Sequence, residues 1–301
     1  MQFVIFLVMD VKHIFKSGTY LSDGAWGTEF LKKGFTIGES ADLLNETRPG
    51  WVREVAAGYA QAGADIILTN TFGANRIALS RFGLESKARE LNRQGVLLSR
   101  QAAGPTAGVF ASLGPTGRMI SAGEITGEAA EEAFLEQAIA LKEAGADAVV
   151  VETMGDLEEY SAAIRAVKTA GLPVAGCMSF DSGKDFLRTL MGVTIDQMVE
   201  AAEGLHADMV GANCGVGVEN YVKIAETLLK KSRLPVWIKA NAGLPRVEKG
   251  GTVYDMTPDR FAGYVKTLSG MGVRVIGGCC GTTPDFIRAS RRALDAFLRG
   301  G

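Results

Sequence analysis

Histidine and cysteine are scarce in this chain, and neither a strong net charge nor a long apolar run is present. The 301 residues include 2 histidines and 4 cysteines, and the formal net charge at pH 7 is −2. This balance gives no reason to expect a nucleic-acid surface or a polybasic membrane anchor. No stretch approaches the roughly 20 apolar residues of a membrane-spanning helix. The sequence therefore favours a cytoplasmic protein that acts on a small molecule.

The apolar start of the chain does not have the pattern of a secretion signal. No basic region precedes it, and Asp10 and Lys12 end the run too early for a signal peptide. We expect residues 1–19 to form an N-terminal cap on a single domain that spans residues 1–301. In the cytoplasm thiols stay reduced, so clustered cysteines favour metal binding or catalysis over disulfides.

Short β-branched or apolar runs alternate with helical stretches along the whole chain. Eight such runs are expected to be strands, the number that closes a barrel, and no Pro/Ser-rich linker interrupts them. The sequence therefore predicts an α/β protein with a (β/α)₈ TIM-barrel fold. The expected strands are Tyr20–Asp23, Ala64–Thr69, Gly108–Leu113, Ala146–Glu152, Val174–Ser179, Asp208–Asn213, Val236–Ala240 and Val273–Gly278. Helical spacing is seen in Pro49–Ala62, Lys87–Ala103, Glu128–Ala144, Asp156–Ala170, Thr194–Gly204 and Glu219–Lys231.

Three segments that follow predicted strands are longer than the others. They are Leu31–Pro49, Gly114–Gly127 and Asn241–Pro258. In a barrel of this type the segments after the strands lie at the C-terminal face, where active sites are built. All three are candidates for walls or lids of a pocket.

Three of the four cysteines follow the ends of predicted strands. Cys214 comes directly after the sixth strand, and Cys279 and Cys280 come directly after the eighth. Strand ends converge at one mouth of a barrel, so the three thiols are expected to meet there. Three thiolates with an open fourth position are typical of catalytic zinc, and the open position would accept a substrate thiol and hold it deprotonated. The alternative is that these cysteines are small buried apolar residues.

The remaining cysteine and the two histidines have weaker claims to a role. Cys177 lies within the fifth predicted strand and is expected to be a core residue, although a closed four-cysteine structural site stays open as an alternative. His13 is near the N-terminal cap and His206 precedes the sixth strand, at the opposite end from the proposed site. Acid–base chemistry by histidine is therefore disfavoured.

Two carboxylates also end predicted strands on the proposed face. Asp23 ends the first strand, and Glu152 follows three consecutive valines at the end of the fourth. A buried carboxylate needs a compensating partner, which the ammonium of an amino acid would supply; the alternative is a hydrogen-bonded structural acid. Asn70, Thr71 and Phe72, after the second strand, are expected to form polar and aromatic pocket walls.

These segments, taken in order, resemble the homocysteine-binding domain of homocysteine S-methyltransferases. The resemblance covers residues from about Tyr20 to the C-terminus, and its Gly-Gly-Cys-Cys-Gly-Thr-Thr-Pro segment is highly specific. Within the family, the sequence is most similar to the N-terminal module of cobalamin-dependent methionine synthases. The segments are Asp23–Glu29, Thr69–Asn75, Gly114–Gly117, Glu152–Thr153, Asn213–Cys214, Asn241–Gly243 and Gly277–Pro284.

The resemblance implies a zinc-dependent methyl transfer to homocysteine that yields methionine. By motif position, Cys214, Cys279 and Cys280 are expected to bind zinc, with the homocysteine sulfur as the fourth ligand. Asp23 and Glu152 match residues around the homocysteine amino group. Gly24, Asn70, Thr71 and Phe72 belong to the same motifs and are expected to contact the substrate. Cys177 matches no ligand of the family.

The methyl donor is the point on which the sequence leaves alternatives open. The chain ends at Gly301 with no folate-binding, cobalamin-binding or reactivation domain after it, so we expect methylcobalamin to arrive on a separate corrinoid protein. One alternative is a small-molecule donor such as S-methylmethionine, betaine or S-adenosylmethionine. Another is a non-catalytic zinc- or thiol-binding subunit.

Overall fold

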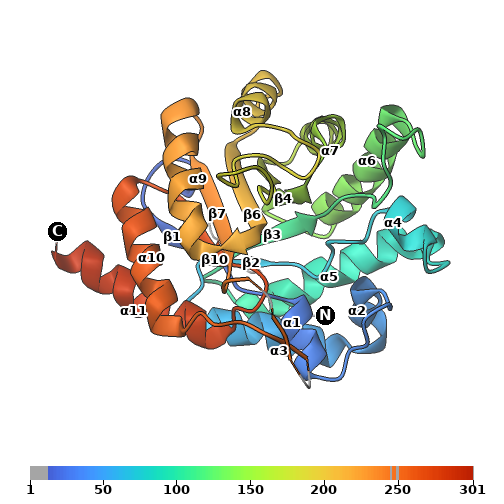
Figure 1. The fold of residues 1–301 in the computed structure, drawn as a ribbon. Helices are drawn as coiled ribbons and strands as arrows, with labels where there is room; N and C mark the ends of the chain where they lie inside the picture. Colours follow the sequence, from blue (N-terminus) through green and yellow to red (C-terminus); the bar gives the residue numbers. More distant parts are fainter. Residues whose placement is uncertain (1–12, 245, 249–250, 301) are drawn as a thin grey trace.

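Eight parallel strands form one curved sheet surrounded by helices in the computed structural model, which describes residues 13–244, 246–248 and 251–300 (Figure 1). The strand order is β1-β10-β7-β6-β5-β4-β3-β2. The two ends of the sheet meet where Ser22 and Ile66 form a parallel bridge and the Asp23 N–H donates to the Ile66 carbonyl at 3.0 Å. The predicted (β/α)₈ barrel is therefore confirmed.

The barrel strands lie in or beside the predicted ranges. The largest difference is in β6, which extends to Gly217 because a bulge after Asn213 lets Gly217 pair with Asn241 of β7. A second irregularity, between Val151 and Met154, extends β4 to Met154. The strands are β1 (Tyr20–Leu21), β2 (Ile66–Leu68), β3 (Gly108–Leu113), β4 (Ala148–Met154), β5 (Val174–Met178), β6 (Met209–Gly217), β7 (Val236–Asn241) and β10 (Val275–Gly278).

The helices between the strands have local start and stop signals. Asp156 accepts hydrogen bonds from the Glu158 and Glu159 N–H groups, and Thr194 forms a capping box with Gln197. The helices are α1 (Gly27–Lys32), α2 (Leu44–Thr47), α3 (Pro49–Gln61), α4 (Arg76–Ser80), α5 (Ala88–Ala103), α6 (Gly127–Glu143), α7 (Leu157–Ala170), α8 (Ile195–Gly204), α9 (Val218–Lys231), α10 (Pro258–Met271) and α11 (Pro284–Gly300), with short 3₁₀ turns at Ala41–Leu43 and Glu85–Lys87.

A separate apolar cluster fills the interior of the barrel at the end opposite the C-terminal mouth. Phe110 stacks on Trp237 with ring centroids 5.9 Å apart, and Cys177 is fully buried in the same cluster. Ile14 joins it, so the described part of the predicted cap, residues 13–19, lies against the barrel; residues 1–12 are outside the described residues. Because side chains of the described residues fill this end of the barrel, a ligand site is expected at the other mouth.

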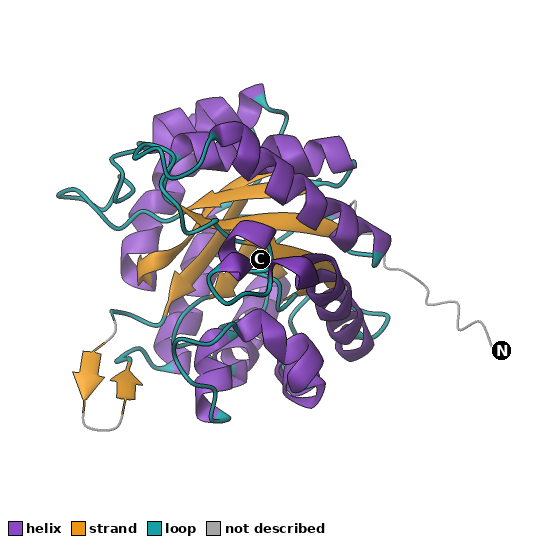
Figure 2. Cartoon of the chain, turned by 90° about the vertical axis from the view of Figure 1, so that its right-hand side faces the viewer, coloured by secondary structure: helices purple, strands orange, loops and turns teal. Residues whose placement is uncertain are grey.

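The segment after β7 contains two strands that the sequence analysis did not predict. β8 (Arg246–Glu248) and β9 (Gly251–Val253) form an antiparallel hairpin, which projects away from the barrel (Figure 2). Within the described residues, no helix is long and apolar enough to cross a membrane.

Candidate metal and substrate site

Three cysteine sulfur atoms meet at the C-terminal mouth of the barrel. The Sγ atoms of Cys214, Cys279 and Cys280 all lie within 4.8 Å of one another, and those of Cys214 and Cys280 are 4.0 Å apart. Cys214 stands on β6 and the other two directly follow β10. Cys177 is not part of this group. The convergence expected from the strand ends is therefore present in the fold.

The backbone around each thiol is held by hydrogen bonds from neighbouring elements. Cys214 has a left-handed backbone with φ of +63°, and its carbonyl accepts a hydrogen bond from the Tyr221 hydroxyl at 2.7 Å. The Cys279 N–H donates to the Ala240 carbonyl at 2.7 Å, and the Cys280 N–H donates to Asn241 Oδ1 at 3.0 Å. A left-handed non-glycine residue is strained, so its surroundings must hold it there.

Thr282 ties the cysteine pair to the first strand. Its hydroxyl donates to the Cys279 carbonyl at 2.7 Å and accepts from the Ala25 N–H at 3.1 Å. A Cβ atom at Gly278 would lie 2.3 Å from Thr282 Oγ1, and one at Gly24 would lie 2.8 Å from the same atom. The glycines in both motifs are thus required by close approach to Thr282.

The three thiols have the chemistry and spacing of a metal site. Two sulfurs bound to one tetrahedral zinc at about 2.3 Å would be about 3.8 Å apart, close to the separation seen here. Hydrogen bonds from Cys279 and Cys280 lower the pKa of Cys214 to about 3. The same contact with Cys214 raises the pKa of Cys280 to about 12 and that of Cys279 well above its usual value. Cys214 is therefore the thiol that loses its proton first, and a bound cation would favour loss of the protons of the other two.

A cavity of about 440 Å³ opens beside the cysteines. All three cysteines line it, as do four of the predicted substrate contacts: Gly24, Asn70, Phe72 and Glu152. Asp23 and Thr71 are not among the lining residues. Of the three long segments expected to form walls or lids, only Leu31–Pro49 contributes lining residues within the described part of the chain, namely Glu39, Ser40, Ala41 and Asp42.

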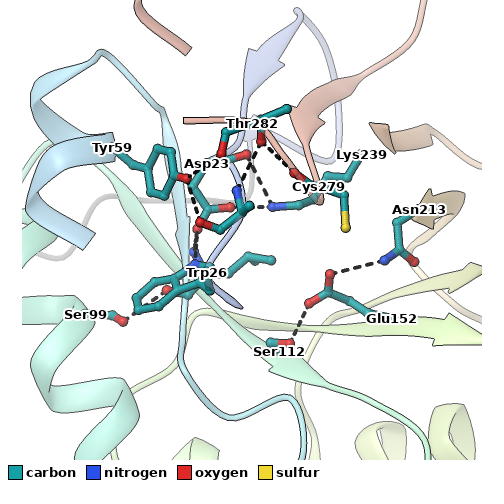
Figure 3. Close-up of polar contacts among 12 residues, drawn as sticks. Asp23, Trp26, Tyr59, Ser99, Ser112, Glu152, Asn213, Lys239, Cys279 and Thr282 are labelled. Carbon is teal, nitrogen blue, oxygen red and sulfur yellow. Dashed lines mark hydrogen bonds and ion pairs between the residues drawn. The ribbon is translucent and has the colours of Figure 1, made fainter. Parts of the chain in front are cut away.

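Glu152 presents a buried carboxylate to this cavity. The Ser112 hydroxyl donates to its Oε1 at 2.5 Å, and the Asn213 amide donates to its Oε2 at 3.5 Å (Figure 3). Burial raises the pKa of Glu152, while the charge of Lys239 acts in the opposite direction. Its two hydrogen-bond donors are neutral, so a cationic ligand would be its first charged hydrogen-bond donor.

Asp23 already has a charged contact inside the protein. Its Oδ1 pairs with the ammonium of Lys239, and its Oδ2 accepts from Trp26 Nε1 at 2.8 Å and from the Leu68 N–H at 2.9 Å (Figure 3). Burial acts to lower the pKa of Lys239, but the carboxylates of Asp23 and Glu152 outweigh burial and raise it. Asp23 is thus held by contacts within the chain and is not among the residues that line the cavity.

Side chains after β2 connect this strand to the segment after β1. Asn70 Nδ2 donates to the Ala41 carbonyl at 2.7 Å, and the Gly73 N–H donates to Asp42 Oδ1 at 3.1 Å. Thr71 is fully buried and donates to the Ser112 carbonyl at 2.7 Å. Asn70 and Thr71 therefore stabilise the wall through internal bonds, whereas Phe72, 43% exposed, presents its ring at the mouth.

Several polar residues of the cavity wall were not predicted from the sequence, among them Lys239, Asn213 and Asp42. Lys239 stands between Ile238 and Ala240 in a strand that reads as buried, and this interrupted apolar run is the signal that could have identified it. Asn213 was noted only as part of the Asn-Cys motif. Asp42 lies in a long segment with no periodic pattern, so nothing local distinguished it. The two histidines, as predicted, do not line the cavity.

The fold and the site define a (β/α)₈ barrel with three thiols at its C-terminal mouth that are spaced so that they could hold a metal ion. The model of the homocysteine S-methyltransferase family matches residues 20–294. The chain therefore belongs to this family of methyltransferases.

Known proteins with related sequences and structures agree with this assignment. The chain is 33% identical to a methionine synthase of Mycobacterium leprae over 91% of its length, and 31% identical to one of Mycobacterium tuberculosis over 96%. It spans only 24% and 26% of those two proteins. Its structure resembles the homocysteine methyltransferase MmuM of Escherichia coli. The oxidized form is 26% identical, with a TM-score of 0.76 over 92% of this chain and 96% of that one. The metallated form is 25% identical, with a TM-score of 0.76 over 94% of this chain and 99% of that one.

Proposed function

We propose that this chain transfers a methyl group to the thiol of homocysteine, giving methionine, with a zinc ion held by Cys214, Cys279 and Cys280. The observation that carries the proposal is the convergence of these three sulfurs within 4.8 Å beside a cavity that Glu152 also lines. The similarity to a homocysteine methyltransferase with a metallated form adds support.

Zinc bound in this way would hold the substrate thiol deprotonated at neutral pH, where a free thiol with a pKa near 8.5 is mostly protonated. The three cysteines would keep the centre anionic, because their combined charge exceeds that of the cation. In the transfer, the bond between the substrate sulfur and the methyl carbon forms as the donor–methyl bond breaks, and the donor keeps that electron pair. The thiol proton leaves to solvent.

Glu152 would bind the ammonium of homocysteine. Glu152 is 6% exposed, and among the described residues its hydrogen-bond donors are the neutral side chains of Ser112 and Asn213. An ammonium placed there would add a charged hydrogen-bond donor in direct contact with the carboxylate and make a charge-assisted hydrogen bond. Asp23, which pairs with Lys239, would contribute to the same end of the site through its charge.

The methyl donor that we propose is a methylated corrinoid carried by a separate protein. Eight of the ten exposed large apolar side chains among the described residues lie between a barrel strand and the next long helix, and two of them, Phe72 and Phe82, line the cavity. They are Leu31, Ile37, Phe72, Phe82, Met119, Leu190, Met191 and Leu244. A partner that covers this rim could present its methyl group to the cavity.

The zinc and homocysteine assignments can be tested by metal analysis and zinc K-edge absorption with and without homocysteine. We expect one zinc per chain and a change from three sulfur ligands with one lighter ligand to four sulfur ligands when homocysteine is added. An unchanged spectrum would contradict the proposal.

The donor can be tested with homocysteine and a panel of methyl donors. We expect methionine with a methylated corrinoid protein and none with S-methylmethionine, betaine or S-adenosylmethionine alone. Turnover with one of these small molecules would replace the corrinoid in the proposal. Zinc and homocysteine binding without turnover with any donor would instead indicate a non-catalytic binding subunit.

A further inference from the structure

Asn213 joins the two halves of the candidate site. It is the residue before Cys214, is 1% exposed and lines the cavity. We propose that Asn213 is a positioning residue that sets the separation between Glu152 and the Cys214 sulfur, and thereby selects a thiol that carries an ammonium at the spacing of homocysteine. This inference rests on the proposed function.

Every polar atom of the Asn213 side chain is used toward β4. Its Oδ1 accepts a hydrogen bond from the Thr153 N–H at 2.7 Å. Its Nδ2 donates to Thr153 Oγ1 at 2.7 Å and, more weakly, to Glu152 Oε2 at 3.5 Å. The amide thus holds both the backbone and the side chain of the residue next to Glu152.

These contacts cross an intervening strand. In the sheet, β5 lies between β4 and β6, so Asn213 reaches over the end of β5. Both connected strands are irregular at this level, since register shifts occur after Val151 and after Asn213. Bulges of this kind re-aim side chains near active sites. Here they turn Glu152 and Cys214 toward the same cavity.

Two strained residues flank the connection. Thr153 has φ of +60° and Cys214 has φ of +63°, and for a β-branched residue such as Thr this conformation is an outlier. Strained backbone persists only where its surroundings hold it, and the two short hydrogen bonds between Asn213 and Thr153, one donated by each residue, supply that restraint. Loss of the Asn213 amide would let Thr153 relax and carry Glu152 with it.

The substrate has a fixed length between its two reactive ends. In homocysteine, three carbon atoms separate the sulfur from the nitrogen. With the sulfur beside Cys214, the ammonium reaches Glu152 only if the carboxylate is held at the matching separation. Asn213 is covalently joined to Cys214 and hydrogen-bonded to Thr153, so it links both ends of the substrate site.

The test compares homocysteine with 4-sulfanylbutanoate, which is homocysteine without its ammonium. Calorimetric titration of the zinc-loaded chain gives the affinity of both ligands for the wild type, Asn213→Ala, Glu152→Gln and the double variant. We expect the wild type to prefer homocysteine by about 10- to 100-fold, because a charge-assisted hydrogen bond is formed. Asn213→Ala should reduce the preference for homocysteine to less than about threefold, with the zinc content retained. In the double variant, the preference should be the same as in Glu152→Gln alone.

A general loss of stability would give a different pattern. Tyr160→Phe is the control, because it removes a buried hydrogen bond at 3.2 Å to the Gly176 carbonyl away from the cavity, and it should keep the full preference. If circular dichroism shows that Asn213→Ala is unfolded, Asn213→Ser takes its place. If a variant at position 213 keeps a preference for homocysteine of about tenfold or more, the inference about Asn213 is wrong and the proposed function is unaffected. The same holds if the effect of the variant adds to that of Glu152→Gln. A wild type that does not bind homocysteine overturns the proposed function and the inference with it.

Discussion

The ammonium of Lys239 and the carboxylate of Asp23 form an ion pair inside the barrel, with side chains that are 2% and 0% exposed. The two residues come from β7 and from the segment directly after β1, and β10 lies between these strands. The same ammonium donates to the Asp23 carbonyl at 3.3 Å. The pair gives Asp23 a positive partner in direct contact, whereas the hydrogen-bond donors to Glu152 are the neutral Ser112 and Asn213.

Lys239→Met should strongly destabilise the protein. The change leaves the Asp23 carboxylate buried without its counter-charge, and breaking one side of a buried ion pair costs about 3–5 kcal/mol. Urea denaturation should show a loss of that order in the free energy of unfolding. Adding Asp23→Asn to the same chain should recover part of the loss, because the uncompensated charge is removed.

An exposed ion pair provides the comparison for Lys239. Lys223 and Asp185 are 3.1 Å apart with side chains that are 52% and 55% exposed, so Lys223→Met should cost less than about 1 kcal/mol. Equal effects of the two substitutions would show that the buried pair has no special role in stability.

The barrel itself follows from local pattern. In β3, the predicted and observed bounds agree because the run is short and is followed directly by Gly114 and Pro115, and length and flanking residues distinguish a buried strand from a helix segment. The convergence of Cys214 with Cys279 and Cys280 was also predictable, because strand ends in a parallel barrel meet at one mouth whatever their separation in sequence. The fold and the thiol cluster could therefore be predicted from short-range sequence patterns and from the rule that parallel barrel strands all end at one mouth.

The polar wall of the cavity could not be predicted in the same way. The contact between Lys239 and Asp23 joins residues 216 positions apart, and no local pattern encodes which buried charges will pair. The bulges that turn Glu152 and Cys214 inward depend on register between whole strands. Segment length also misled: Gly114–Gly127 and Asn241–Pro258 are long, but neither contributes described residues to the cavity lining.

Cys279→Ala should abolish zinc binding. Two remaining thiolates do not complete the protein part of a catalytic zinc site, which uses three ligands. Plasma emission spectroscopy should show a fall from about one zinc per chain to near zero, with methyl transfer lost at the same time. Cys177→Ala is the matched control, since this thiol is fully buried in the lower barrel and outside the cluster; it should retain zinc. Retention of zinc and activity by Cys279→Ala would refute the metal assignment.

Glu152→Gln should weaken homocysteine binding without removing the metal. The neutral amide cannot pair with the ammonium, and a hydrogen bond to a charged group is worth about 1.5–3 kcal/mol, or roughly 10- to 150-fold in affinity. Steady-state assays should show this as a rise in KM that exceeds any fall in kcat.

Glu159→Gln is the control for Glu152. Glu159 is also buried, but it accepts hydrogen bonds from the Thr116 N–H and hydroxyl and does not line the cavity. Its substitution should leave KM for homocysteine unchanged. A similar KM effect from both variants would mean that Glu152 acts through general stability rather than through the substrate.

Asp42→Asn should stabilise the protein at neutral pH and not in acid. Burial raises the pKa of Asp42 from 3.8 to about 6. Between pH 4 and 6 the folded state therefore binds more protons than the unfolded state, and the free energy of unfolding of the wild type falls as pH rises through this window. A shift of two pKa units corresponds to about 3 kcal/mol above pH 6. Asparagine avoids this penalty and can still accept the hydrogen bond from the Gly73 N–H.

Urea denaturation at pH 4.5 and pH 7.5 measures the effect of Asp42→Asn directly. The stability difference between variant and wild type should grow by about 2–3 kcal/mol from the lower to the higher pH. Asp185→Asn, at a side chain that is 55% exposed, serves as the control, and its stability difference should stay within about 0.5 kcal/mol at both pH values. The stability difference between Asp42→Asn and the wild type could instead stay the same at both pH values. The folded protein would then hold the charged Asp42 carboxylate at little cost, and the cavity wall would solvate it better than its burial indicates.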